Sequence, residues 1–279
     1  MMKRNICLVI VTLFLSLAAG AKEKDVVAMQ SMVKRLIPAY AENFQFRKMK
    51  PIDGKDCFRL DASDPRKIII SGNNANSMAM GLNHYLRYYC LTTISWYADI
   101  PVEMPETLPA VEKPIQIEAK VDRRFFLNYC TYGYTMPFWQ WKDWERLIDW
   151  MALNGINMPL ALVATEGIAV RVWKQLGLTE KEIEEFYTGP AHLPWQRMGN
   201  IVNHDGPLPA SWHKEQIALQ HRILHRMKSL GMTPICPAFS GFVPRGILRL
   251  YPEAKLHRVG RLASKKPRPF SFSGRAPFP

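Results

Sequence analysis

The sequence has few cysteines, and none of them form a pattern typical of metal or redox chemistry. Only five occur in 279 residues, and no C-x-x-C pair is present, so zinc-ribbon and thioredoxin-like functions have no support. Cys57, Cys90, Cys130 and Cys236 are too few to form a disulfide scaffold in a chain of this length. We expect mostly free, buried thiols and no cofactor. A glycine-rich phosphate loop is also absent.

Long hydrophobic runs are equally scarce. The longest, residues 7–18, is too short to span a membrane, and no other stretch approaches about 18 apolar residues. Lys3 and Arg4 precede this run, and the small residues 19–21 follow it, which is typical of a secretory signal. We therefore expect a signal peptide at residues 1–21, a secreted or periplasmic protein, and no membrane span.

Acidic residues are outnumbered by basic ones, but the excess does not predict a nucleic-acid site. The formal net charge is +13. Two of these positive charges lie in the predicted signal peptide, and five more lie in residues 261–279, which contain no acid. The remaining charge of about +6 forms no stripe, so a solvated surface is favoured and no nucleic-acid partner is expected.

Residues 22–121 predict a small α+β domain. A helix over 22–38 is expected to end at Pro38, and short strands are expected at 44–46, 57–62 and 67–70. Spacings of three and four then predict a helix, carried by Met78, Leu82, Tyr85, Leu86 and Tyr89. Residues 95–121 are rich in proline and acid and predict loop and linker.

Residues 122–260 alternate between strand and helix patterns. We expect strands at 124–128, 156–162 and 232–239, and helices at about 144–155, 166–176, after Ser211, and at 244–251. Thr179 and Glu182 predict a capping box, and residues 187–210 predict a loop. Repeating β/α units of this length are typical of a parallel sheet or a (β/α)8 barrel.

Six of the eight tryptophans lie between Trp139 and Trp195. Their flat faces suit a sugar ring, although we expect most of them in the core. In a barrel, active groups follow the carboxyl ends of the strands. This rule places Asn128, Cys130 and Tyr134 after the first strand, Glu166 after the second, and Trp195 and Met198 in the long loop.

Several polar residues allow two interpretations. Glu166 is either a general acid or, as we favour, a partner of the helix dipole. Glu145 and Asp149 share a helix face, which we expect to be solvated. Surface histidines are favoured over metal ligands, and no metal is expected, although two histidines have the spacing of ligands on one helix face. These histidines are His221 and His225. Three further histidines could also bind a metal, and they are His192, His204 and His213. Cys130 as a nucleophile has no local support.

Longer motifs in fixed order resemble the α-N-acetylglucosaminidases, glycoside hydrolases that remove terminal α-linked N-acetylglucosamine. These motifs are residues 128–131 with Tyr134, 144–157, 189–200, 206–209 with Ser211 and Trp212, and 232–239. The resemblance implies a small α+β domain at 22–121 and the first part of a (β/α)8 TIM-type barrel at 122–260, truncated after about three of eight strands.

The resemblance also implies a mechanism and a site. Family members use a retaining mechanism with two glutamates about 5 Å apart, one as acid and one as nucleophile. Asn128 and Tyr134 would form hydrogen bonds, Cys130 and Met198 would form a polarizable wall, and Trp195 would be the platform for the sugar. The expected partner is a glycan with terminal α-linked N-acetylglucosamine.

The sequence departs from the family pattern in three places. Residues 164–167 read Ala-Thr-Glu-Gly where Gly-Gln-Glu-Ala is usual, with Ala169 at a tryptophan position, and Phe242 replaces a histidine. We expect the resemblance to stop near residues 259–260, before the strands that carry the family's catalytic glutamates. The tail, residues 261–279, is basic and proline-rich, and we expect it to be disordered. A shifted frame or a mispredicted end is favoured over a genuine tail that binds an anionic partner.

The sequence leaves three hypotheses open. The chain is a truncated α-N-acetylglucosaminidase that is inactive alone, with no catalytic residue of its own. Alternatively, it is a non-catalytic sugar-binding remnant that keeps Asn128 and Trp195. The third hypothesis is an unstable product, because an open three-stranded sheet leaves apolar strand edges unpaired.

Overall fold

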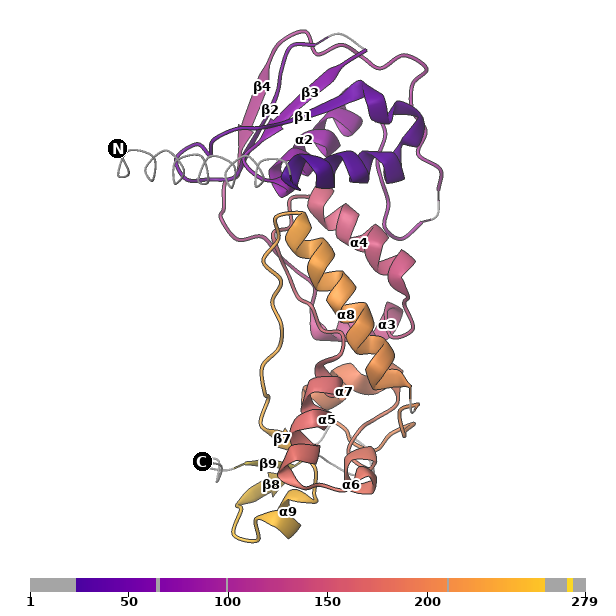
Figure 1. The fold of residues 1–279 in the computed structure, drawn as a ribbon, viewed down its shortest axis with the longest axis vertical. Helices are drawn as coiled ribbons and strands as arrows, with labels where there is room; N and C mark the ends of the chain where they lie inside the picture. Colours follow the sequence, from indigo (N-terminus) through magenta and orange to yellow (C-terminus); the bar gives the residue numbers. More distant parts are fainter. Residues whose placement is uncertain (1–23, 64–65, 99, 210, 259–269, 273–279) are drawn as a thin grey trace, which may run out of the picture. The chain divides into compact units, whose positions relative to one another are not determined.

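The computed structural model describes residues 24–258, apart from 64–65, 99 and 210, together with residues 270–272 (Figure 1). The predicted signal peptide and the rest of the predicted tail lie outside the described residues. Contacts divide the chain into two compact units. Unit 1 comprises Met1–Phe126, Glu145–Pro159 and His225–Pro234, and unit 2 comprises Leu127–Trp144, Leu160–Leu224 and Ile235–Pro279. Helices α4 (Trp141–Leu153) and α8 (Trp212–Ser229) contribute residues to both units.

Unit 1 contains a four-stranded sheet. Its strands are β1 (Phe44–Lys48), β2 (Cys57–Leu60), β3 (Ile68–Gly72) and β4 (Ile115–Glu118), in the order β1-β3-β2-β4. β1 and β3 are parallel, and β2 runs antiparallel to both β3 and β4. The first three confirm the predicted strands, but β4 lies in the stretch predicted as loop and linker. Its residues alternate between isoleucine and a polar residue, but three of the four are exposed and the strand lies at the sheet edge. The surrounding proline-rich, acidic composition predicted a loop instead.

The helices of unit 1 follow their sequence signals. A helix over residues 24–36 ends before Pro38, which opens the 3-10 helix η1 (Pro38–Asn43). α2 (Ala75–Tyr88) packs against β2 and β3 (Figure 1). The side chain of Asn74 caps α2 by accepting a hydrogen bond from the Ser77 backbone N–H at 2.8 Å. The predicted apolar face is confirmed, since Met78, Leu82, Tyr85 and Leu86 are fully buried.

Unit 1 also holds a pair of parallel strands of the barrel type. β5 (Phe125–Phe126) pairs with β6 (Met158–Pro159), and the intervening chain includes α4. Both strands are shorter than predicted, and Leu127 adopts a left-handed φ of 90° at the end of β5. This β–α–β arrangement is the repeating element of a (β/α)8 barrel.

The charged face of α4 is not solvated, so that prediction is wrong. Asp149 is 2% exposed and accepts hydrogen bonds from Arg35 at 3.0 Å (Nε) and 2.8 Å (Nη2). Glu145 lies 3.7 Å from Arg35 Nε and also pairs with Arg226. A buried carboxylate requires such partners because an isolated charge is very costly to remove from water.

Unit 2 is mainly helical. Its helices include α3 (Tyr129–Thr135), α5 (Thr165–Leu176), α6 (Glu180–Glu184), the 3-10 helix η2 (Pro190–His192), α7 (Leu193–Arg197) and α9 (Ile247–Leu250). A sheet in the order β7-β9-β8 consists of β7 (Phe242–Val243), β8 (Leu256–Arg258) and β9 (Phe270–Phe272). Trp173, Ile183, Leu193, Val243 and Ile247 belong to one buried apolar cluster.

Parts of unit 2 differ from the predictions. The expected loop over 187–210 contains η2 and α7. The expected third strand is reduced to an isolated parallel bridge between Leu160 and Ile235. Within the tail that we expected to be disordered, residues 270–272 form β9.

Tryptophan and cysteine burial also depart from expectation. Of the six clustered tryptophans, only Trp144 and Trp173 are buried, and the others are partly exposed. The described cysteines are free, as predicted, but only Cys57 is buried and Cys236 is exposed. In the ranges that the structure describes, no helix combines the length and the apolar character needed to cross a bilayer.

The predicted capping box begins α6. The Thr179 N–H donates to Glu182 Oε2 at 2.8 Å, and the Glu182 N–H donates to Thr179 Oγ1 at 3.3 Å. Arg249 of α9 donates to both carboxylate oxygens of Glu182 at 2.9 Å. The hydrogen bond from Arg249, together with the backbone bond from Thr179, lowers the pKa of Glu182 to about 2.

This pKa predicts an acid-dependent loss of stability. Because the folded pKa lies below the ordinary value of 4.5, the stabilisation is present above about pH 4.5 and is lost as the pH falls towards 2. We expect Arg249→Gln to raise the pKa of Glu182 and to flatten this loss, as measured by carboxyl titration in NMR and by thermal melts. Lys174→Gln removes only the exposed partner of Glu180 and is the control. An unchanged Glu182 midpoint in Arg249→Gln would contradict the assignment.

Candidate functional site

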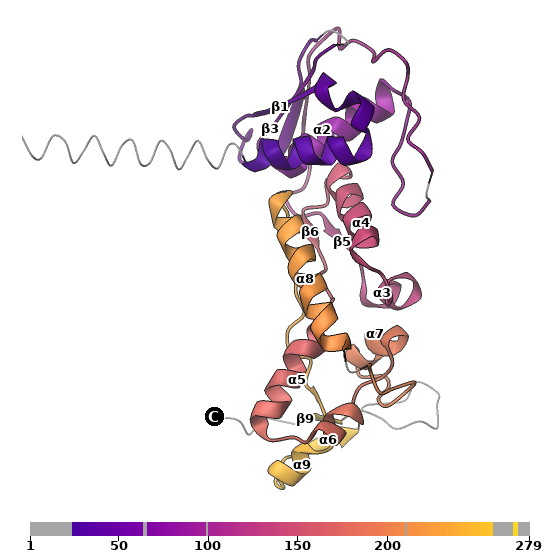
Figure 2. The same cartoon turned by 45° about the vertical axis from the view of Figure 1, so that its right-hand side comes forward.

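Two short helices of unit 2 carry all five residues that the resemblance assigned to the sugar pocket. Asn128, Cys130 and Tyr134 belong to the cap and body of α3, whereas Trp195 and Met198 belong to the body and cap of α7. These two helices pack against each other (Figure 2). The fold therefore brings together two groups of residues that are far apart in the sequence.

Asn128 begins α3 as its N-cap. Its Oδ1 atom accepts hydrogen bonds from the Thr131 backbone N–H at 3.0 Å and from Thr131 Oγ1 at 2.8 Å. Both lone pairs of the carbonyl oxygen are thus engaged, while the amide NH₂ group takes no part in the cap. Asn128 is exposed, so it can donate to a ligand while α3 remains capped.

Tyr134 and Trp195 form an edge-to-face aromatic pair between α3 and α7. Their ring centroids are 5.4 Å apart at an interplanar angle of 83°. Tyr134 is 73% exposed, and Trp195 is partly exposed. Gly133 permits this approach, because a Cβ atom there would lie 2.6 Å from the Trp195 ring. Cys130 lies one turn before Tyr134 and shares its face of α3.

A buried ion pair joins α7 to α5. Arg197 donates from Nε to Glu166 Oε1 at 2.7 Å and from Nη2 to Oε2 at 3.0 Å. The two side chains are only 8% and 4% exposed. The guanidinium also lies over the ring of Tyr132 in α3, with 5.1 Å between Arg197 Cζ and the centroid. Arg197 of α7 therefore contacts both α5, through the bidentate pair, and α3, through the ring of Tyr132.

Burial and charge oppose each other at this pair. Burial alone would lower the pKa of Arg197, but the Glu166 carboxylate raises it above its ordinary value. Glu166 lies in the first turn of α5, as the helix-dipole interpretation requires. The sequence did not predict that Arg197 would be the main partner of Glu166. The available signal was the position of Arg197 between Trp195 and Met198, two of the predicted site residues.

Two departures from the family pattern lie next to these elements. Ala164, the N-cap of α5, adopts a left-handed φ of 62° without a side-chain cap bond, a conformation that the glycine of the family pattern adopts without steric cost. Phe242 of β7 lies so close to Gly199 that a Cβ atom there would be 2.2 Å from its ring. This contact fixes the position of Gly199, the residue that follows Met198.

Three carboxylates of unit 2 are held by cations or imidazoles. Glu166 pairs with Arg197, Glu182 pairs with Arg249, and Asp205 lies within 3.3 Å of two histidine nitrogens. Retaining hydrolysis requires two carboxyl groups about 5 Å apart on either side of the scissile bond. Each of these three carboxylates already has a partner, so no two of them form the free pair that this mechanism requires.

A separate cleft lies within unit 1 and contains none of the five predicted residues. Asp56, Met80, Arg124 and Gly155 are among its walls. Asp56 accepts hydrogen bonds there from Arg124, at 2.5 Å, and from Asn74, at 2.7 Å. These bonds connect the residue before β2 to the N-cap of α2 and to the residue before β5, which is a structural role.

Both parts of the chain match models of one protein family. Residues 27–110 match the profile of the alpha-N-acetylglucosaminidase (NAGLU) N-terminal domain, and residues 124–273 match that of its TIM-barrel domain. The second match extends beyond residues 259–260, where we expected the resemblance to stop.

Individual relatives agree with these profiles. Human alpha-N-acetylglucosaminidase is 42% identical over 248 residues, which are 87% of this chain and 33% of the human protein. The family 89 glycoside hydrolase from Clostridium perfringens, solved with 2-acetamido-1,2-dideoxynojirmycin, superposes with a TM-score of 0.85 at 34% identity, over 91% of this chain and 29% of that one. Its double Glu-to-Gln variant, solved with its substrate GlcNAc-alpha-1,4-galactose, gives a TM-score of 0.84.

These matches define first a class and then a family. The chain has a glycoside hydrolase fold, with a small α+β domain followed by part of a (β/α)8 barrel. Within that class, it belongs to the α-N-acetylglucosaminidase family. The resemblance and the fold class predicted from the motifs are confirmed. The chain spans about a third of the length of the relatives it matches.

The buried ion pair predicts a large cost for removing one charge. Glu166→Gln leaves Arg197 buried without a counter-charge, and we expect a loss of about 3–5 kcal/mol in the free energy of unfolding, measured by urea denaturation. The double variant Glu166→Leu/Arg197→Leu should recover part of that loss.

The matched control is Glu180→Gln, which breaks an exposed pair with Lys174. It should leave the free energy of unfolding nearly unchanged, because water and salt screen an exposed ion pair. Equal losses in Glu166→Gln and Glu180→Gln would show that the buried pair does not hold α5 and α7 together.

Proposed function

We propose that this chain provides the sugar-recognising part of an α-N-acetylglucosaminidase active site. The observation that carries the proposal is the packing of α3 on α7, which places the rings of Tyr134 and Trp195 at 5.4 Å and leaves Tyr134 73% exposed. Family membership and the substrate complex of the C. perfringens relative support it. The ligand proposed is the terminal α-linked N-acetylglucosamine of a glycan.

The chemistry of the two helices suits such a ligand. A pyranose has apolar C–H faces and a polar rim, and Trp195 combines a broad apolar face with a polar tip. The Asn128 amide and the Tyr134 hydroxyl supply donors for the rim. Cys130 and Met198 supply soft, polarizable surface that adapts to an irregular ring.

Recognition of N-acetylglucosamine depends on Trp195 in this proposal. We expect N-acetylglucosamine at millimolar concentration to give a measurable binding heat with the 279-residue chain, and Trp195→Ala to weaken binding at least about tenfold, or ~1.4 kcal/mol. Trp141→Ala is the matched control, because Trp141 packs on Arg222, with 4.3 Å between its ring centroid and Arg222 Cζ. Melting scans beforehand separate loss of binding from loss of folding. No heat from the folded, unaltered chain would refute sugar recognition.

The proposed role of the residues on α3 and α7 is to bind the sugar, and it does not include hydrolysis. The three carboxylates described above are already paired, and Glu166 acts as a structural partner of Arg197 rather than as a proton donor. The acid and the nucleophile of a retaining reaction would be carboxyl groups other than these.

An assay of the purified 279-residue chain with an aryl α-N-acetylglucosaminide tests this. We expect no turnover, whereas typical enzymes reach about 1–10³ s⁻¹. Turnover in that range would contradict the proposal. Its persistence or loss in Glu166→Gln would then decide whether Glu166 is the acid.

We propose in addition that the protein is exported. The basic start, the apolar run over residues 7–18 and the small residues 19–21 support this. A mature N-terminus at Lys22, found by N-terminal sequencing of the protein from its native cells, would support export. An unprocessed N-terminus would contradict it.

A further inference from the structure

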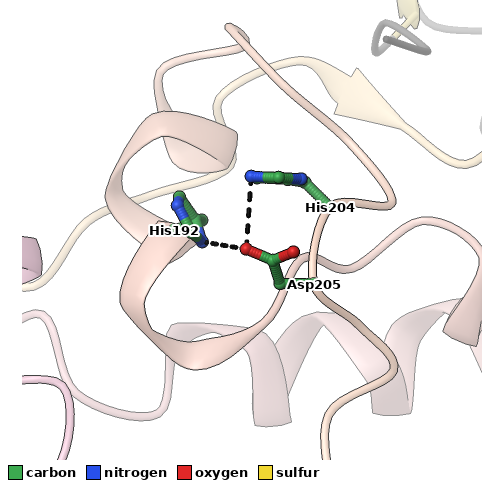
Figure 3. A group of neighbouring side chains, drawn as sticks. All are labelled: His192, His204 and Asp205. Atoms are coloured by element: carbon green, nitrogen blue, oxygen red, sulfur yellow. Dashed lines mark ion pairs between the residues drawn. The ribbon is translucent and has the colours of Figure 1, made fainter.

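Three side chains with metal-binding atoms lie close together in unit 2. His192 ends η2, and His204 and Asp205 follow α7 in the chain. Figure 3 shows His192 and His204 directed towards the same oxygen of Asp205. His192 Nδ1 lies 3.3 Å from Asp205 Oδ2, and His204 Nε2 lies 3.2 Å from it. One ligand atom from each residue lies within 4.8 Å of the other two. From the sequence alone, surface histidines are favoured and no metal is expected here.

These separations suit ligands of a single ion. Zn²⁺ binds imidazole nitrogen at about 2.0–2.1 Å and carboxylate oxygen at about 2.0–2.2 Å, so two ligands of a tetrahedral site lie about 3.4 Å apart. The two nitrogen-to-oxygen distances are close to this value.

A hydrogen bond does not account for the closeness of His192 to Asp205. His192 Nδ1 is buried and has no hydrogen-bond partner among the described residues, although the carboxylate oxygen is 3.3 Å away. Buried polar atoms are ordinarily hydrogen-bonded. Neighbouring ligands of one ion direct their lone pairs at the ion and not at each other, which produces a short separation without a hydrogen bond.

The backbone holds these residues together. The Gly189 N–H donates to the His204 carbonyl at 2.7 Å. A Cβ atom on Gly189 would lie 2.2 Å from the Asp205 carbonyl oxygen, and one on Gly206 would lie 2.8 Å from the Tyr187 carbonyl oxygen. The two segments therefore pack backbone to backbone, which preorganises the ligands before an ion binds.

We propose that His192, His204 and Asp205 bind one divalent cation of the zinc class. Two imidazoles favour such an ion over Mg²⁺ or Ca²⁺, which prefer oxygen ligands. Three protein ligands leave a fourth position open. The His192 ring centroid lies 6.2 Å from that of Trp195, so the ion ties residues 204–206 to the segment that carries the aromatic platform. This site does not depend on the proposed sugar recognition.

Zinc titration of the metal-stripped, full 279-residue chain tests the proposal. We expect one Zn²⁺ per chain by calorimetry and by metal content after gel filtration, with a rise in Tm that Mg²⁺ does not produce. Asp205→Asn and His192→Phe should each lower zinc affinity by more than the roughly 10–100-fold that loss of a second-shell partner costs. Asparagine tolerates the left-handed φ of 54° at this position, and phenylalanine keeps a ring of similar size. Metal-free melting scans verify that both variants fold.

The exposed pair His221 and His225 provides the matched control. These residues are four apart on α8, a spacing that can bind zinc adventitiously. The double variant His221→Ala/His225→Ala should keep its zinc. Absence of 1:1 binding in the unaltered chain, undiminished affinity in Asp205→Asn and His192→Phe, or loss of zinc from the α8 double variant would each overturn the proposal.

Discussion

The buried ion pair between Glu166 and Arg197 is the constraint on which the site in unit 2 depends. α3 and α7 have seven and five residues, and isolated helices of this length are not stable in water. Their positions must come from tertiary contacts. Arg197 supplies them in two directions, through its bidentate bonds to α5 and through the face of Tyr132 in α3. The tight Gly133–Trp195 contact then brings the two helices together.

In unit 2 the charged groups of the ion pair are buried, and the predicted site residues at the surface are neutral. The charges of Glu166 and Arg197 are buried and neutralise each other, whereas Tyr134 and Asn128 remain exposed. The side-chain carbonyl of Asn128 is already engaged, because it accepts the hydrogen bond that caps α3. Neutral aromatic faces and amide donors remain for a ligand. Such a surface is consistent with the sugar recognition proposed above, whereas cleaving a glycosidic bond requires free carboxyl groups.

The loop after α7 shows how backbone packing can create side-chain chemistry. Gly189 and Gly206 permit contacts that any Cβ atom would prevent. As a result, His192 and Asp205, which are thirteen positions apart, come within 3.3 Å of each other. The family pattern at 189–200 drew attention to Trp195 and Met198, but it did not indicate that His192 would meet a carboxylate.

The sequence by itself determined the local elements and the family. Helix faces such as Met78–Leu82–Tyr85, the Thr179–Glu182 capping box and the end of the first helix before Pro38 depend on residues a few positions apart, so their signals can be detected in the chain. Tertiary structure alone decided what depends on distant partners. These features include the pairing of exposed β4 with β2, the burial of Asp149 by Arg35, and the meeting of Glu166 with Arg197. Which strand pairs with β4, and which helix supplies a counter-charge, depends on residues far away in the sequence, so no local pattern specifies these partners.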